Sequence, residues 1–433
     1  MSNATRRTPF SPNPGRLKHV RRLLSRRGLL AVLGTLGPGM VAAIAGDDAG
    51  GIATYATVGA QYGYDLLWSI VIITIFLAVV QEMVARLSVV TGKGLSDLIR
   101  EEFGVRTSAL AMLTLFIANG AVTMSEFVGI AAAGELFGVP RYISVPISAA
   151  AVWWLVVRGN YRAAEKVFLA LGFILATYVI SAIVVQPDWG AVLRGTLIPT
   201  IHLDQTFLLV LVATIGTTIS PYMQFTLSST IVDKGVRLEE YRGEFWETLL
   251  GVFLSDLFAY FIIIATAATL YLRGITQIDS AAQAALALQP IAGPLAEYLF
   301  GFGLLGASLL AASVLPLSTA YSVCEAFGWE RGVNQAWRDA PVFYIIYTGL
   351  IVAGAAVALI PGAPLFLVFI LVYDLNGILL PILLVLMVRL ANNRRLLGDR
   401  INGRIANLLA VSTTVILIVL TILLLLSPLL PSH

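Results

Sequence analysis

The 433-residue sequence has little charge, histidine or cysteine, and each shortage excludes a class of protein or site. Charged residues make up 12% of the chain, whereas soluble globular proteins carry about 25%. So little charge cannot coat a soluble body of this size, and most of the surface must therefore face lipid. The single cysteine, Cys324, excludes an internal disulfide and a cysteine-built metal site. His19, His202 and His433 lie outside the apolar segments, so histidine is not available for metal binding or proton relay within the membrane.

Long apolar runs are what the sequence has in abundance. A bilayer-crossing helix needs about 20 mostly apolar residues, whereas the strands of a membrane barrel alternate over about ten. Eleven segments meet the helical requirement: 28–62, 66–90, 107–135, 141–158, 163–185, 206–232, 244–272, 296–325, 341–360, 365–390 and 405–428. The sequence therefore predicts an all-α membrane protein with 11 transmembrane helices.

Lysine and arginine gather on one side of these spans. With the N-terminus in the cytoplasm, 25 of the 28 Lys and Arg residues fall on the cytoplasmic side, and only Arg141, Arg194 and Arg273 fall outside. Because cytoplasmic loops are rich in these residues, we expect a multi-pass plasma-membrane protein with its C-terminus outside the cell. Residues 1–27 are predicted to form a disordered cytoplasmic tail, because a further span follows instead of a cleavage site and a soluble domain. Its basic residues indicate topology and lipid contact rather than nucleic-acid binding.

Two of the predicted spans are interrupted at matching places. The first contains Gly-Asp-Asp-Ala-Gly-Gly at 46–51, and the sixth contains Gly-Thr-Thr-Ile-Ser-Pro at 216–221. These spans are the first members of two five-helix halves, 28–185 and 206–390. Interrupted helices at corresponding positions indicate a transporter with inverted repeats and a site near the membrane midplane. A simple kink is the alternative for either break, but a kink does not require two adjacent aspartates.

The residues around the first break resemble the Nramp family of divalent-metal transporters. The resemblance is carried by Leu36-Gly37-Pro38-Gly39, by Ala53-Thr54, Tyr62-Gly63-Tyr64 and Leu66-Leu67-Trp68 beyond the break, and by the stretch 92–101. It is strong over residues 30–135 and includes the break in the sixth span. It implies a LeuT-like (APC) fold of two inverted five-helix repeats, with helices 1 and 6 unwound and an eleventh span, 405–428, appended. It also implies a secondary transporter, not an enzyme, that needs no cofactor.

The sequence departs from the family at both breaks. The family's Asp-Pro-Gly-Asn is Asp48-Ala49-Gly50-Gly51 here, so the metal-binding Asn is replaced by Gly51, and Met-Pro-His is Ser220-Pro221-Tyr222. Soft sulfur favours transition metals, whereas oxygen ligands suit magnesium, calcium and manganese. Magnesium also keeps several of its waters, so an oxygen-only, roomier site favours a partly hydrated hard cation. The pattern is similar to the Nramp-related magnesium transporters, a branch that also accepts manganese.

Two sets of candidate residues follow. The resemblance places the metal beside the Asp48 carboxylate, the vacant place left at Gly51 and the main-chain carbonyls of Ala45 and Thr217, and the Ser220 hydroxyl stands at the second break. Other polar residues at membrane depth are costly and are therefore candidates for the pathway or for support of the site. They are Asp47, Glu126, Tyr222, Gln224, Asp256, Tyr373, Asp374 and Asn376. For each of these, a structural hydrogen bond or ion pair is the alternative role.

The places that support proton movement in proton-coupled Nramps hold Tyr222 and Thr123. Without a side chain that titrates near neutral pH, uncoupled uptake of Mg²⁺ and Mn²⁺ by alternating access is the simpler hypothesis. One alternative is a proton-coupled Mn²⁺/Fe²⁺ importer that uses Glu126, Asp256 or Asp374. A more distant one is an amino-acid transporter of the same fold, in which the two aspartates would repel the substrate carboxylate. We expect partners to be limited to the metal and the lipid bilayer, with no obligatory protein partner and a monomeric chain.

Overall fold

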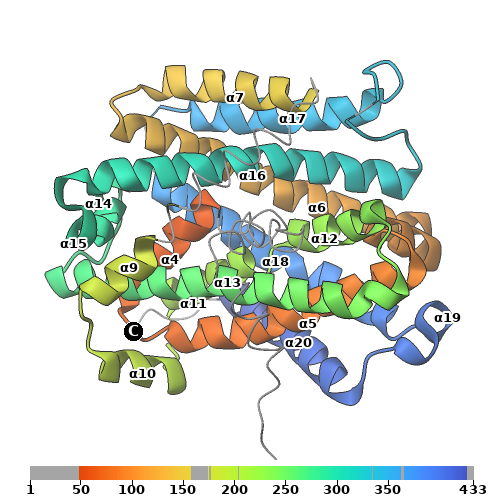
Figure 1. Ribbon diagram of the computed structural model, residues 1–433, viewed down its shortest axis with the longest axis horizontal. Coiled ribbons are helices and arrows are strands. Elements are labelled where there is room, and N and C mark those ends of the chain that lie inside the picture. Colours follow the sequence, from red (N-terminus) through yellow and green to blue (C-terminus); the bar gives the residue numbers. More distant parts are fainter. Residues whose placement is uncertain are drawn as a thin grey trace, which may run out of the picture.

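The computed structural model describes residues 48–157, 174, 177–202, 204–333, 335–361 and 365–426. Every regular element within these residues is an α- or 3-10 helix (Figure 1). The long helices are α4 (Ala49–Tyr62), α5 (Leu67–Thr91), α6 (Leu95–Leu136), α7 (Arg141–Val157), α11 (Gln205–Thr218), α12 (Pro221–Lys234), α13 (Tyr241–Thr269), α16 (Ala296–Phe327), α17 (Pro341–Ala358), α18 (Leu365–Ala391) and α20 (Arg404–Leu426). The short helices are α9 (Thr177–Val184), α10 (Trp189–Leu197), α14 (Ala281–Ala285), α15 (Gln289–Ala292) and α19 (Arg394–Leu397).

Eight helical segments in this part of the chain are long and apolar enough to cross a membrane. The α11–α12 pair counts as one of them, and α7 is apolar but has only 17 residues. Together these nine match the predicted second to fourth and sixth to eleventh spans. The described helix of the first predicted span is α4, and the described helix of the fifth is α9, at the end of that span.

Helix α6 is longer than the predicted third span. It has 42 residues and begins at Leu95 rather than at position 107. Gly104 has φ 76° and ψ −178° and bends the helix, in a region of positive φ that glycine adopts without a steric penalty. The mostly apolar stretch that was predicted to cross the membrane begins just after this bend, which explains the difference.

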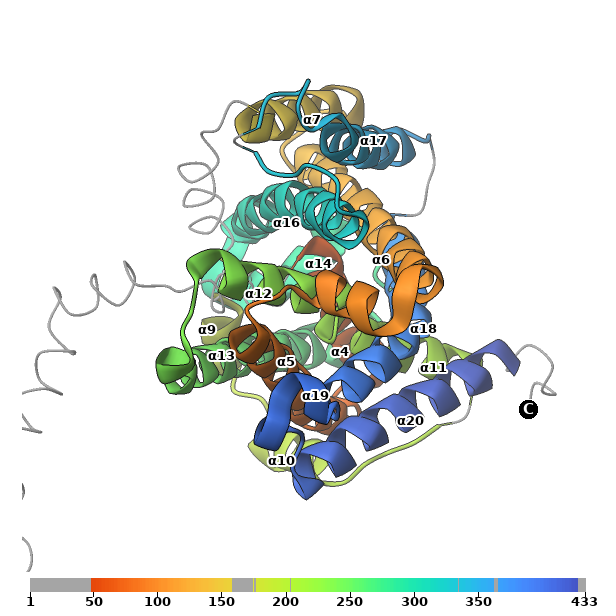
Figure 2. The same cartoon turned by 90° about the vertical axis from the view of Figure 1, so that its right-hand side faces the viewer.

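Most of the long helices run roughly along the long axis of the molecule in Figure 1, and Figure 2 shows the bundle from one end of that axis. Helices α7 and α17 lie side by side at one edge, with α6 and α16 packed beneath them (Figure 2). Helices α4, α11 and α18 lie against one another below that layer, and α13, α5 and α20 complete the bundle. Twelve of the 14 residues of α4 are buried. A helix that is apolar all round is typical of such an enclosed position.

The outer helices expose large apolar side chains. Ile147 on α7, Ile345 on α17 and Leu408 on α20 are 62–67% exposed. Apolar surface on this scale is unfavourable in water, whereas it is compatible with the hydrocarbon core of a bilayer. The chain is therefore a multi-pass membrane protein that shows its apolar side chains to lipid and keeps many polar ones inside.

The sixth span is broken where the sequence predicted. Helix α11 ends at Thr218, Ile219 leaves the helical region with ψ 65°, and Ser220 is extended with ψ 137°. Pro221 is the first residue of α12. Proline lacks an N–H and has its φ fixed near the helical value, so it suits the first position of a helix and ends the one before it.

Candidate functional site

Asp48 caps the N-terminus of α4. Its backbone is extended, and its Oδ1 accepts a hydrogen bond of 2.8 Å from the Gly51 amide. A carboxylate is favoured here because it satisfies an unpaired amide of the first turn and lies at the positive end of the helix dipole. Asp48 is only 2% exposed. The residues before it, including the predicted site residues Ala45 and Asp47, lie outside the described part of the chain.

Glu126 of α6 reaches the same helix end. Its Oε2 accepts a hydrogen bond of 3.3 Å from the Ala49 amide, and the side chain is fully buried. Its Oε1 has no protein partner. The structure thus brings Asp48 and Glu126 to the first turn of one helix, close enough to interact electrostatically. Two buried carboxylates repel each other, and a bound dication relieves that repulsion.

Tyr373 of α18 covers the first turn of α4. A Cβ added at Gly50 would fall 2.1 Å from Cε2 of the Tyr373 ring, so only glycine lets the ring approach this closely. The hydroxyl of Tyr373 is directed toward the Asp48 carboxylate, and the ring is fully buried. The ring of Tyr373 therefore forms one wall of the site, and it comes from α18, the tenth predicted span.

Helix α18 also holds the break in the sixth span. The Nδ2 of Asn376 donates hydrogen bonds of 2.8 Å to the Gly216 carbonyl and of 2.9 Å to Ser220 Oγ. One side chain thus bridges the last turn of α11 and the residue before α12. Thr217 lies between them, is 2% exposed, and its Oγ1 has no protein partner. The predicted residues Thr217, Ser220, Tyr373 and Asn376 are therefore brought together across two helices.

Three further predicted residues, Tyr222, Gln224 and Asp374, are neighbours in sequence of residues in this group. Tyr222 is buried in an apolar cluster that also contains Tyr373 and Met223. Both side-chain oxygens of Asp374 and both polar atoms of Gln224 lack protein partners, and both residues are at most 4% exposed.

Asp256 of α13 lies apart from this group. It is 4% exposed, and the side chain beside it is Thr74 of α5. No described hydrogen bond or ion pair connects Asp256 to either break. Of the predicted pathway residues, it is the one that the described contacts link least to the two broken helices.

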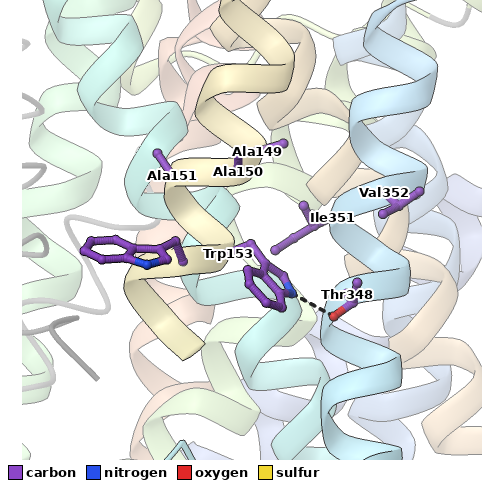
Figure 3. Close-up of a pocket in the computed structure, with 8 residues that line it drawn as sticks. Ala149, Ala150, Ala151, Trp153, Thr348, Ile351 and Val352 are labelled. Carbon is purple, nitrogen blue, oxygen red and sulfur yellow. Dashed lines mark hydrogen bonds between the residues drawn. The ribbon is translucent and has the colours of Figure 1, made fainter. Parts of the chain in front are cut away.

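A crevice of about 630 Å³ lies elsewhere, between α7 and α17 (Figure 3). Its walls include three consecutive alanines, 149–151, and Trp153, whose indole Nε1 donates a 2.9 Å hydrogen bond to Thr348 Oγ1 (Figure 3). It opens on the face of the protein that carries exposed apolar side chains. Because it contains no ionisable group, it is a lipid-facing feature and not a site for an ion.

The polar side chains around Asp48 offer a cation oxygen donors. The carboxylates of Asp48 and Glu126 supply negative charge, and hydroxyl and amide oxygens of Thr217, Ser220 and Asn376 lie at the second break. Among the described residues, no group of three or more His, Cys, Asp or Glu side chains is placed to hold a metal ion, so any ion here would also use neutral oxygen ligands or water. Nor do the ion pairs found among them involve either carboxylate. Such a donor set matches the preference of hard divalent cations.

Three features of the site were not predicted from the sequence. They are the contact of Glu126 with the α4 amide, the fit of Tyr373 over Gly50, and the presence of Met223 one turn after Ser220. The sequence signal for the Glu126 contact was the isolated carboxylate of Glu126 within an apolar helix. The glycines at 50, 216 and 377 signalled close approach, but not which helix would approach.

Comparison with known proteins gives consistent matches. The family described as natural resistance-associated macrophage protein-like (Nramp) matches residues 39–427. The divalent metal cation transporter MntH of Yersinia pestis (strain Pestoides F) is 28% identical over 361 residues, covering 78% of this chain and 87% of that protein. MntH of Bacillus subtilis (strain 168) is 31% identical over 307 residues, covering 67% and 71%.

Solved structures show the same fold. A manganese transporter of Eremococcus coleocola, in complex with an aromatic bis-isothiourea compound, matches with a TM-score of 0.74 at 22% identity, covering 92% of this chain and 87% of that one. Mhp1, a nucleobase-cation-symport-1 transporter in a closed conformation, matches with a TM-score of 0.53 at 16% identity, covering 90% and 91%. The predicted LeuT-like fold is therefore confirmed.

Proposed function

Because the chain belongs to the Nramp family, we propose that it takes up Mg²⁺ and Mn²⁺ by alternating access without moving protons. It is a divalent metal cation transporter of that family and not an enzyme, and the metal is its substrate. The family membership favours a metal over the amino-acid alternative. The choice of ion and the absence of coupling rest on the residues around Asp48.

The observation that carries the proposal is a buried group of oxygen atoms without protein partners. They include Glu126 Oε1, Thr217 Oγ1 and Asn376 Oδ1, all in residues at most 2% exposed. Buried polar atoms almost always have a partner, so these atoms are suited to face water or an ion. A partly hydrated Mg²⁺ keeps several waters and uses one or two carboxylates. It therefore supplies both an ion and water molecules as partners for these oxygen atoms.

The residues that replace the family's ligands favour the same ion. Ser220 stands where the family has Met, and its hydroxyl accepts a hydrogen bond from Asn376. Gly51 contributes no side chain, and its amide is occupied by Asp48. Losing a thioether lowers the affinity for soft metals, and losing a bulky ligand leaves space for water. Manganese, which is borderline in hardness, remains a substrate.

Uncoupled uptake needs no titratable relay. Tyr222 replaces the family's histidine and packs in an apolar cluster. An inward-negative potential contributes about 2.3 kcal/mol per charge per 100 mV. For a dication this doubles to about 4.6 kcal/mol, which supports a gradient of roughly a thousandfold. The membrane potential is therefore sufficient to drive accumulation.

The second candidate is a proton-coupled Mn²⁺/Fe²⁺ importer. It is favoured by the membrane carboxylates with unpartnered oxygens, namely Glu126, Asp256 and Asp374. Acidification of the vesicle lumen during metal uptake would support it and would defeat the uncoupled version.

The proposal includes an orientation and an assembly state. The distribution of Lys and Arg supports a plasma-membrane protein with its N-terminus in the cytoplasm and its C-terminus outside. The side chains of Asp48, Glu126 and Asn376 are at most 2% exposed within a single chain, so the site needs no second chain to enclose it, which supports a transporter that works as a monomer.

The proposed site is tested with Asp48→Ala. This change removes a charge that a dication would contact, so Mg²⁺ influx into proteoliposomes should fall to background. Asp65→Ala is the matched control, because Asp65 is an exposed aspartate in the turn between α4 and α5. Influx at the wild-type rate in the Asp48 variant would contradict the site.

A further inference from the structure

Asn376 lies where two helix backbones come unusually close. A Cβ added at Gly216 of α11 would fall 2.1 Å from the Tyr373 carbonyl oxygen of α18. One added at Gly377 would fall 2.8 Å from the Val212 carbonyl oxygen. The two glycines thus let α11 and α18 pack backbone against backbone. As a result Asn376, which is fully buried, is held directly beside the break in the sixth span.

The hydrogen bonds of Asn376 fix the orientation of its amide. The Gly216 carbonyl can only accept, so the group that faces it must be Nδ2, and Ser220 Oγ takes the second N–H. Both donors are therefore used by the protein. Oδ1 is then turned away from these two partners, and it is buried without a protein partner.

A buried amide oxygen without a protein partner is suited to bind a hard cation. Leaving a buried acceptor unsatisfied is unfavourable, and amide oxygens of Asn are among the oxygen ligands that hard divalent cations take. Tyr373, one turn earlier on the same helix, covers Gly50 and points its hydroxyl at Asp48. The two groups therefore belong to one site rather than to separate parts of the bundle.

We infer that Asn376 Oδ1 binds the transported dication directly, and that it supplies from the tenth span the amide oxygen that the first span lacks at Gly51. This inference rests on the proposed function and deepens it by naming a ligand. The hydrogen bonds that Asn376 donates to Gly216 and Ser220 then have a function, because they orient the ligand and connect the bound ion to the broken helix.

Manganese is the probe for the direct test, because Mn²⁺ is paramagnetic and is a proposed substrate. Wild-type protein labelled with asparagine carrying ¹³C at the side-chain carbonyl is loaded with Mn²⁺ and measured by electron–nuclear double resonance. We expect a ¹³C coupling of the size produced by a directly bound amide. It should vanish in Asn376→Ala and persist in Asn119→Ala.

Asn119 is a matched control because it is also a buried asparagine whose amide oxygen lacks a protein partner. It is fully buried in α6, its Nδ2 donates a 2.8 Å hydrogen bond to Thr319 Oγ1, and its Oδ1 also lacks a protein partner. A wild-type spectrum with bound Mn²⁺ but no such coupling, or a coupling that survives in Asn376→Ala, overturns the inference alone. A protein that binds no divalent cation overturns the proposed function as well.

A second measurement separates a ligand from a merely bridging residue. Asn376→Ala should weaken Mg²⁺ and Mn²⁺ binding by about tenfold or more, equivalent to about 1.4 kcal/mol. Asn376→Asp keeps an oxygen ligand and adds charge, but loses the N–H groups that hold Gly216 and Ser220. A ligand role predicts that the Asp variant binds the dication far better than the Ala variant. Equal loss in both variants would mean that Asn376 only bridges the break.

Discussion

The contact between Gly216 and α18 can be tested by adding a single methyl group. In Gly216→Ala the new Cβ would lie 2.1 Å from the Tyr373 carbonyl oxygen and 2.7 Å from the Gly377 amide nitrogen. Both neighbours are backbone atoms, which cannot rotate away as a side chain can. The two helices must therefore separate for the variant to fold.

The size of that separation follows from the contact distances. Real Cβ atoms essentially never come within 3.0 Å of such atoms, so the helices must part by the difference between 3.0 and 2.1 Å, about 0.9 Å. The same shift would lengthen the 2.8 Å bond from Asn376 to the Gly216 carbonyl to about 3.7 Å. That is too long for a hydrogen bond. Overpacking of this kind costs about 1–3 kcal/mol of stability.

We expect Gly216→Ala to lower metal influx into proteoliposomes by at least about tenfold and to lower the thermal stability of the purified protein. Gly349→Ala is the control, because Gly349 lies in α17 with no atom within 4 Å of an added Cβ. There alanine should be neutral or should stabilise the helix by up to about 1 kcal/mol. If both variants transport and unfold like the wild type, the close packing does not hold the site.

Three further changes test the choice of ion and the support of the fold. Gly51→Asn together with Ser220→Met restores the family's amide and thioether, so the ion selectivity of transport should shift from Mg²⁺ toward Mn²⁺ and Cd²⁺. Unchanged inhibition by Mg²⁺ in competition assays would show that the softness of these two ligands does not set the selectivity. Met223 packs in an apolar cluster, so Met223→Leu should change the Mn²⁺/Mg²⁺ preference by less than about twofold. A larger loss of Mn²⁺ uptake would identify its sulfur as a ligand. Arg86 joins α5 to Asn402 before α20, so Arg86→Met should lower the free energy of unfolding by about 1–3 kcal/mol with unchanged selectivity, and an unchanged melting temperature would refute this role.

The sequence carried enough information to predict the break in the sixth span. Serine followed by proline after two threonines ends one helix and begins another, and the structure places that change at Ile219 and Ser220. The position of Asp48 at a helix N-terminus could also be predicted, because aspartate is a preferred N-cap residue. These features depend on local chemistry, which the sequence shows directly.

The contacts that build the site are not local. Glu126 meets Ala49 across 77 residues, and Asn376 meets Gly216 across 160. Hydropathy identifies such residues as polar groups in the membrane, but it does not say which partner each one meets. For the same reason Asp256 could not be distinguished from Asn376 by sequence, although the structure places it beside Thr74 of α5.

Transport of a hard dication that is driven by the membrane potential and independent of protons can be measured directly. Mg²⁺ influx is recorded in proteoliposomes at clamped membrane potentials, with and without a pH gradient, while the lumen pH is followed. We expect influx that rises with inward-negative potential, is the same with and without the pH gradient, and leaves the lumen pH unchanged. Influx that requires the pH gradient or acidifies the lumen, or the absence of any Mg²⁺ influx alongside Mn²⁺ transport, would contradict it.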